Sequence, residues 1–98
     1  MLSCHEIHQR PVIDAAGATI GEVEALLVNP TGWHVEALRV RLSREATHQV
    51  GASRGLFRGA VIDVSMAAVQ SIGDTVLLRM RAEDLRPSPH QAATAYPR

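Results

Sequence analysis

The sequence predicts an all-β fold, a small and strongly bent barrel of about five or six strands followed by a disordered C-terminal tail. Short runs of alternating apolar and polar residues are separated by turn signals rich in Gly, Pro, Asn and Asp. The spacing of apolar residues favours a helix nowhere in the chain. Gly21 lies inside the second expected strand, where a glycine indicates the bend that a small closed barrel needs.

The composition is that of one globular domain. The chain has 98 residues and a hydrophobic fraction of 46%, with one Trp, one Tyr and one Phe, so the expected core is aliphatic. Because this core is small, self-association would add stability. We expect a flexible start over residues 1–5, a barrel domain over residues 6–82 and a Pro-rich flexible tail over residues 83–98.

The charge balance argues against a general nucleic-acid-binding protein, and the cysteine content bears on the cellular compartment. Ten basic residues, all Arg, balance ten acidic ones, and zero net charge argues against broad electrostatic binding to nucleic acid. A single Cys fits a reducing compartment. The first residues lack a basic region followed by an apolar run, and no apolar run approaches the roughly 20 residues of a membrane span. We therefore expect a cytoplasmic protein without a transmembrane segment.

Residues 12–28 are the stretch around which the barrel is expected to form, as a strand, a tight turn and a longer strand. Asp14 at the first turn position and Gly17 at the fourth suit a type I turn followed by a left-handed glycine. The first strand is expected within residues 6–13 and the second over residues 19–28. Gly21 predicts a bend or a close approach of another backbone.

The third expected strand, over residues 33–42, changes phase. Apolar residues occupy odd positions up to Ala37 and even positions from Leu38 onward. Because side chains alternate between the two faces of a strand, this change predicts a β-bulge or a sharp coil near these two residues. A long loop is expected over residues 43–59.

Two further strands are expected in the second half. Residues 60–66 alternate so that Asp63 faces solvent, and a Gly-Asp pair within residues 71–75 indicates a hairpin. The last strand, over residues 75–81, places Leu77 on the outer face.

The pattern Asp14-x-x-Gly17-x-x-Ile20-Gly21-x-Val23 resembles the signature of the PRC-barrel domain, named for the photosynthetic reaction centre H subunit and found also in the ribosome maturation factor RimM. The run of residues 61–78 is similar to the second half of this family. The resemblance covers about residues 6–82 and implies a stand-alone PRC-type barrel that acts as an interaction module. It implies a structural role, without catalysis, for the motif residues Asp14, Gly17, Ile20, Gly21, Val23, Gly73 and Asp74.

Cys4, His5 and His8 form the one potential metal cluster, C-H-x-x-H. Thiolate and imidazole groups suit zinc, but a second Cys is missing and the spacing fits no common zinc pattern. We interpret these residues as a solvated polar start and expect neither a metal nor another cofactor.

Signatures of catalysis are missing from the sequence. There is no nucleophile elbow, phosphate loop or dinucleotide fingerprint, and neither His34 nor His48 has a partner that the sequence reveals. Three glutamates could form a carboxylate site, but we interpret them as a solvated face with arginine partners across the strands. These glutamates are Glu22, Glu24 and Glu36, and the expected partners are Arg39 and Arg41. We predict no enzymatic activity.

Three apolar residues fall where strand alternation predicts solvent: Leu26, Val28 and Leu77. Exposed apolar clusters mark association surfaces, so these residues predict an interface with a second copy or with a protein partner of unknown identity. The alternative is that a loop or the tail covers them.

Arg39, Arg41, Arg54 and Arg58 could converge into a basic patch. The planar guanidinium group suits phosphates. By analogy with RimM, this patch would make the protein an RNA-associated or ribosome-associated factor. Nucleic-acid contact is the alternative function, and protein interaction is the one we favour.

Overall fold

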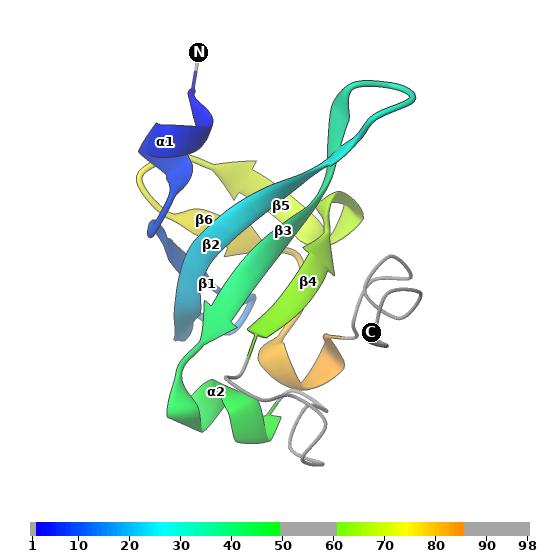
Figure 1. Ribbon diagram of the computed structural model, residues 1–98. Helices are drawn as coiled ribbons and strands as arrows, with labels where there is room; N and C mark the ends of the chain where they lie inside the picture. Colours follow the sequence, from blue (N-terminus) through cyan, green and yellow to red (C-terminus); the bar gives the residue numbers. More distant parts are fainter. Residues whose placement is uncertain (1, 50–60, 86–98) are drawn as a thin grey trace.

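The computed structural model describes residues 2–49 and 61–85 and shows a curled six-stranded sheet (Figure 1). The strand order is β4-β3-β2-β1-β6-β5. Neighbouring strands are antiparallel except β1 and β6, which are parallel. The strands are β1 (Pro11–Ile13), β2 (Thr19–Asn29), β3 (His34–Leu42), β4 (Val61–Ser65), β5 (Val69–Ile72) and β6 (Val76–Leu78). The predicted small all-β fold is confirmed.

The sheet curls because its two outer strands are consecutive in the chain. β4 and β5 lie at opposite edges, yet only the 3-10 turn η1 (Met66–Ala68) joins them. Three residues of 3-10 helix advance about 6 Å. A flat sheet of six strands would separate its edges by roughly 24 Å, at about 4.8 Å per spacing. The sheet therefore bends back on itself as a half-barrel, with β5 and β6 behind β2 and β3 (Figure 1).

Aliphatic side chains fill the inside of the curl. Ile20, Leu38, Ile62 and Leu78 are all at most 2% exposed. Leu85 is 1% exposed and follows η2 (Ala82–Asp84), so the core continues into the segment where the tail was expected to begin. The rest of that segment, residues 86–98, lies outside the described residues.

The turn between β1 and β2 has the predicted geometry. Gly17 adopts φ +89°, and its N–H donates to the carbonyl oxygen of Asp14 at 2.9 Å. Gly21 makes the expected close approach, because a Cβ at this position would lie 2.1 Å from the backbone oxygen of Arg41 on β3. Glycine is thus required at both positions, for conformation at the first and for space at the second.

The pairing of β2 with β3 contains two irregularities. Glu24 is the additional residue of β2 in one, and Glu36 is the additional residue of β3 in the other. The sequence placed the bulge between Ala37 and Leu38, so the structure moves it toward Glu36. The change of phase itself is present, since Ala37 and Leu38 are both buried.

Two short helices were not predicted. α1 (Cys4–Ile7) overlaps both the expected flexible start and the beginning of the first expected strand, and β1 begins only at Pro11. Ser3 and Glu6 form a reciprocal capping box that starts this helix. Four residues are too few to display a helical apolar period, so the periodicity could not reveal α1.

The second unpredicted helix, α2 (Arg44–Gln49), begins the expected long loop. Ser43 Oγ accepts a hydrogen bond from the N–H of Ala46, whose side chain is buried. Residues 50–59 of the expected loop, and residue 60 of the next expected strand, lie outside the described residues. Neither α1 nor α2, nor any other helix of residues 2–49 and 61–85, has the length and apolar character of a membrane span.

The expectation that Asp63 faces solvent is wrong. Its side chain is 0% exposed, because it pairs with Arg39 of the neighbouring strand β3. The last strand is also shorter than expected and ends at Leu78, although Met80 still packs against the core.

Candidate interaction site

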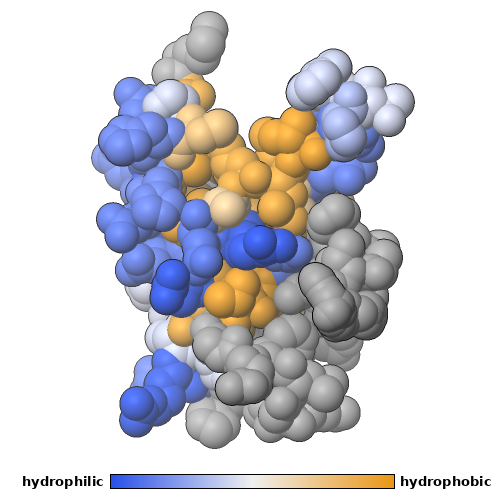
Figure 2. Space-filling model, viewed as in Figure 1, coloured by the Kyte–Doolittle hydropathy of each residue, from blue (hydrophilic) through white to orange (hydrophobic). Residues whose placement is uncertain are grey.

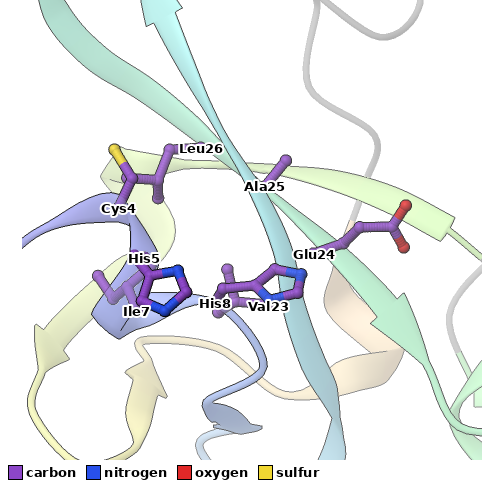
Figure 3. Close-up of a pocket in the computed structure, with 8 residues that line it drawn as sticks. All are labelled: Cys4, His5, Ile7, His8, Val23, Glu24, Ala25 and Leu26. Carbon is purple, nitrogen blue, oxygen red and sulfur yellow. The ribbon is translucent and has the colours of Figure 1, made fainter.

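An open groove lies between α1 and β2. Its volume is about 330 Å³. Figure 2 shows the corresponding face as a V-shaped hollow with an apolar floor between two prongs, which are α1 and the β2–β3 hairpin of Figure 1. The lining residues, drawn in Figure 3, are Cys4, His5, Ile7 and His8 from the α1 side and Val23, Glu24, Ala25 and Leu26 from β2.

The α1 wall is fixed to β2 by its buried side chain and by the backbone that follows it. Ile7 is 5% exposed and belongs to the core cluster. Gln9 N–H donates to the Val23 carbonyl oxygen at 2.7 Å, and Val23 N–H donates to the Arg10 carbonyl oxygen at 3.0 Å. The groove is therefore preformed on one side.

The other prong is the β2–β3 hairpin, whose turn is organised by Asn29. Its side-chain oxygen accepts hydrogen bonds from the N–H groups of Thr31, at 2.8 Å, and Gly32, at 3.3 Å. The backbone carbonyl oxygen of Asn29 accepts a third hydrogen bond, from the N–H of Trp33, at 2.6 Å. Trp33 at the tip is 79% exposed and adopts φ +56°, a conformation that is rare for a bulky residue.

The structure separates the three predicted interface residues. Leu26 lines the groove and is half-buried against the core, and Val28 lies two residues further along β2 with 46% exposure. Leu77 is 36% exposed but lies on β6 and does not line the groove.

Both described arginines of the predicted basic patch are engaged by carboxylates. Arg39 donates two hydrogen bonds to the buried Asp63, at 2.8 and 3.1 Å. The hydrogen bond to Asp63 raises the pKa of Arg39 above its usual value. Arg41 Nη2 lies 2.8 Å from Glu24 Oε1, an ion pair without hydrogen-bond alignment. Arg54 and Arg58 lie outside the described residues.

Within the part of the chain that the structure describes, the histidines and the cysteine do not assemble a metal site. Cys4, His5 and His8 are exposed around the groove. No three His, Cys, Asp or Glu side chains within residues 2–49 and 61–85 are arranged to hold a metal ion. His34 Nε2 lies 3.9 Å from Glu36 Oε2 on the exposed hairpin. His48 belongs to α2, but its side chain lies outside the described part of the chain.

The residues of the PRC-like motif lie in the scaffold. Ile20 and Val23 are each 1% exposed in the core, and Gly73 donates its N–H to the Thr75 carbonyl oxygen in the β5–β6 hairpin, next to the exposed Asp74. Asp14 caps the backbone of the first turn at Ala16 and Ala18 and also the N–H of Ala82.

Two features of the site were missed from the sequence. α1 left a signal in the capping box Ser3-x-x-Glu6, whereas no sequence pattern marked Trp33 as an exposed hairpin tip. In the comparisons with known proteins, no protein-family model matches the chain, and no curated protein matches it.

Proposed function

We propose that this protein is a non-enzymatic protein–protein interaction module that resembles PRC-barrel domains, self-associates and acts as a scaffold or adaptor. The observation that supports this function is the apolar surface left open between α1 and the β2–β3 hairpin. The single Cys of the chain fits a role in the cytoplasm.

The physical case rests on side chains that remain in water. Trp33 and Val28 project from one hairpin with 79% and 46% exposure, and the half-buried Leu26 precedes Val28 by two residues on β2. Burial of apolar surface stabilises a complex by about 25 cal/mol per Å². Tryptophan is moreover the residue most typical of the few positions that dominate binding energy. A protein surface is the partner that would cover this region.

The alternative function, RNA or ribosome association, gains no support from the described arginines. Arg39 and Arg41 already share their charges with Asp63 and Glu24. A phosphate would have to displace a carboxylate at each position, which reduces the gain from binding.

Site-specific photo-cross-linking tests the proposed function. The full chain would carry a photoreactive residue at Val28 or, as a control, at Gln70, an exposed position on β5. Each form would be irradiated alone and in an extract of its source cells, and adducts would be identified by mass spectrometry. We expect discrete protein adducts from position 28 and few from position 70. Equal labelling at both positions, or no protein adduct at position 28, would overturn the proposal.

A further inference from the structure

We infer that the groove receives Trp33 from a second copy of this chain, so that two copies exchange this side chain reciprocally in a twofold dimer. This inference rests on the proposed function and names the partner and the mode of contact. The two halves of the contact, a projecting indole and an apolar groove, are present on the same molecule.

Trp33 has the features of a binding anchor. It is the only Trp of the chain, and its 79% exposure at a hairpin tip leaves a large apolar ring in water. Its φ of +56° is unfavourable for a bulky side chain, and residues held in such conformations concentrate at functional positions. Burial in a partner would recover the area that the monomer leaves exposed.

The groove fits a group of this size and character. Its volume of about 330 Å³ falls within the roughly 300–1,000 Å³ of sites that hold small organic groups. Ala25 and Leu26 supply accessible apolar surface above the nearly buried Ile7 and Val23, and the imidazoles of the α1 side supply polar edges (Figure 3). An indole combines an apolar face with one N–H donor, which matches this mixture.

The groove is out of reach of the Trp33 of the same molecule. Leu26 and Trp33 belong to the same hairpin, and the three residue steps along β2 from Leu26 to Asn29 alone separate them by about 10 Å. Because β2 is hydrogen-bonded to β3 along this length, the hairpin cannot fold back onto its own floor. A second copy can instead insert its hairpin between the two prongs seen in Figure 2.

A twofold axis limits the assembly to a closed dimer. In such a dimer, each interaction of one Trp33 with the other groove occurs a second time with the roles reversed. The arrangement therefore gives two anchors and ends at two copies. A head-to-tail use of the same groove would continue into a polymer, which light scattering distinguishes from a dimer.

The polar groups beside the two surfaces are complementary. Glu36 lies near the hairpin tip with a 47% exposed side chain. Its Oε2 accepts from Asn29 Nδ2 at 3.1 Å, and a carboxylate has further acceptor sites to offer. His5 and His8 lie exposed along the groove. The carboxylates on the groove side already have partners, since Glu6 accepts from the Ser3 N–H and Glu24 pairs with Arg41. The imidazole N–H groups can therefore meet the incoming Glu36 of the second copy.

The chain carries its own probes for a test. Trp33 is the only Trp, and Cys4, the only Cys, lines the groove. A copy alkylated at Cys4 with a bulky, non-fluorescent maleimide keeps the indole and loses the groove. A Trp33→Ala copy keeps the groove and loses the indole. Light scattering over a concentration series should show a dimer for the untreated wild type and a monomer for each altered copy.

Mixing the two altered copies is the decisive step. One indole-to-groove contact is restored in the mixed pair, so the emission of the alkylated copy should shift to shorter wavelength as the Trp33→Ala copy is added. We expect Trp33→Ala to weaken dimerisation at least about tenfold. The control, Leu77→Ala, removes a 36% exposed apolar side chain away from the groove and should leave the dissociation constant within about twofold. Circular dichroism would confirm that all forms are folded.

The outcomes separate this inference from the proposed function. A dimer that survives Trp33→Ala but not Leu77→Ala, or a mixture without an emission shift, overturns the inference and leaves the interaction module standing. A monomeric wild type with short-wavelength Trp emission shows that its own chain covers Trp33, which also overturns the inference. If the wild type is a monomer and position 28 cross-links another protein, the groove binds that protein and not a second copy, which also overturns the inference. The proposed function itself fails only if cross-linking labels positions 28 and 70 equally or gives no protein adduct at position 28.

Discussion

Asp14 accepts a hydrogen bond from the backbone N–H of Ala82, a residue 68 positions further along the chain. The other oxygen of the same carboxylate accepts from Ala16 at 3.0 Å and from Ala18 at 2.9 Å. One side chain, 6% exposed, thus holds the first tight turn and fastens η2 to it. Loss of this carboxylate would leave three backbone donors without their acceptor.

We therefore predict that Asp14→Ala lowers the free energy of unfolding by about 2 kcal/mol, because a lost cap costs about 1 kcal/mol and a buried donor left unsatisfied costs more. Urea denaturation followed by circular dichroism measures this change. Asp74→Ala is the matched control, since Asp74 is exposed in the β5–β6 hairpin and its loss should cost no more than about 0.5 kcal/mol. Equal effects of the two substitutions would contradict the capping role.

The same carboxylate predicts a dependence of stability on pH. Burial alone would raise the pKa of Asp14, but the hydrogen bonds from Ala18, Ala82 and Ala16 outweigh it and, with Arg81 nearby, lower the pKa below its usual value. A pKa that is lower in the folded state stabilises the fold above the ordinary value of about 3.9 and loses this effect as the pH falls through the folded pKa. The stability difference between wild type and Asp14→Asn should therefore be constant from pH 7 to about 5 and shrink below about 4. A difference that grows on acidification would show the opposite shift.

Gly21 should tolerate no side chain. Because a Cβ would lie 2.1 Å from the Arg41 carbonyl oxygen, Gly21→Ala forces β2 and β3 apart and should cost about 1–3 kcal/mol or more. Gly73→Ala provides the control, since no heavy atom lies within 4 Å of the position of its Cβ. Thermal unfolding of both variants checks the difference. A Gly21→Ala protein as stable as Gly73→Ala would show that the two strands can separate freely.

Local signals in the sequence predicted the parts of the fold that depend on neighbouring residues. Asp14 and Gly17 determine their turn within four positions. The glycine at position 21, inside an expected strand, indicated the close approach of another backbone that the structure shows at Arg41. The alternation in β4 failed at Asp63, because this carboxylate is buried by Arg39, 24 positions away. Period-two patterns describe which face a residue occupies and contain no information on a distant charge partner.

The candidate site was harder to predict for the same reason. Leu26 was recognised as unusual for its face, but the groove beside it exists only because α1 packs on β2 through Ile7. That contact joins two segments whose own patterns are weak. Trp33 was expected within a strand, whereas the Asn29 turn places it just before β3 and in a left-handed conformation that no pattern of polarity reveals.

The Arg39–Asp63 pair should respond unequally to loss of either partner. Asp63 is 0% exposed and the Arg39 side chain 38%, so Arg39 keeps contact with water while Asp63 does not. Arg39→Met removes the guanidinium from a buried carboxylate and should cost about 3–5 kcal/mol. Asp63→Asn leaves a cation that water can still reach and should cost less, about 1–3 kcal/mol. Urea denaturation at pH 7 gives both values, and the reverse order would contradict the burial of the carboxylate.

Replacing Trp33 by a residue suited to its backbone should stabilise the monomer. Asn tolerates the left-handed region that Trp33 occupies at φ +56°, whereas this region costs other residues roughly 1–2 kcal/mol. Trp33→Asn should therefore raise the free energy of unfolding by up to about 1 kcal/mol at dilutions where light scattering shows a monomer. Thr31→Asn, in the same turn but without positive φ, should produce no such gain. A destabilised Trp33→Asn monomer would mean that the indole contributes to the fold itself.

The parallel pairing of β1 with β6 has a consequence for the order of folding. Val12 of β1 lies opposite Val76 of β6. One edge of β1, the first strand to be synthesised, therefore has no hydrogen-bonding partner until β6, the last described strand, has been made. The β2–β3–β4 portion can assemble as soon as it leaves the ribosome, while the inner edge of β1 stays open to other chains. We therefore expect the pairing of β1 with β6 to be slow, because it closes a loop that contains most of the described domain.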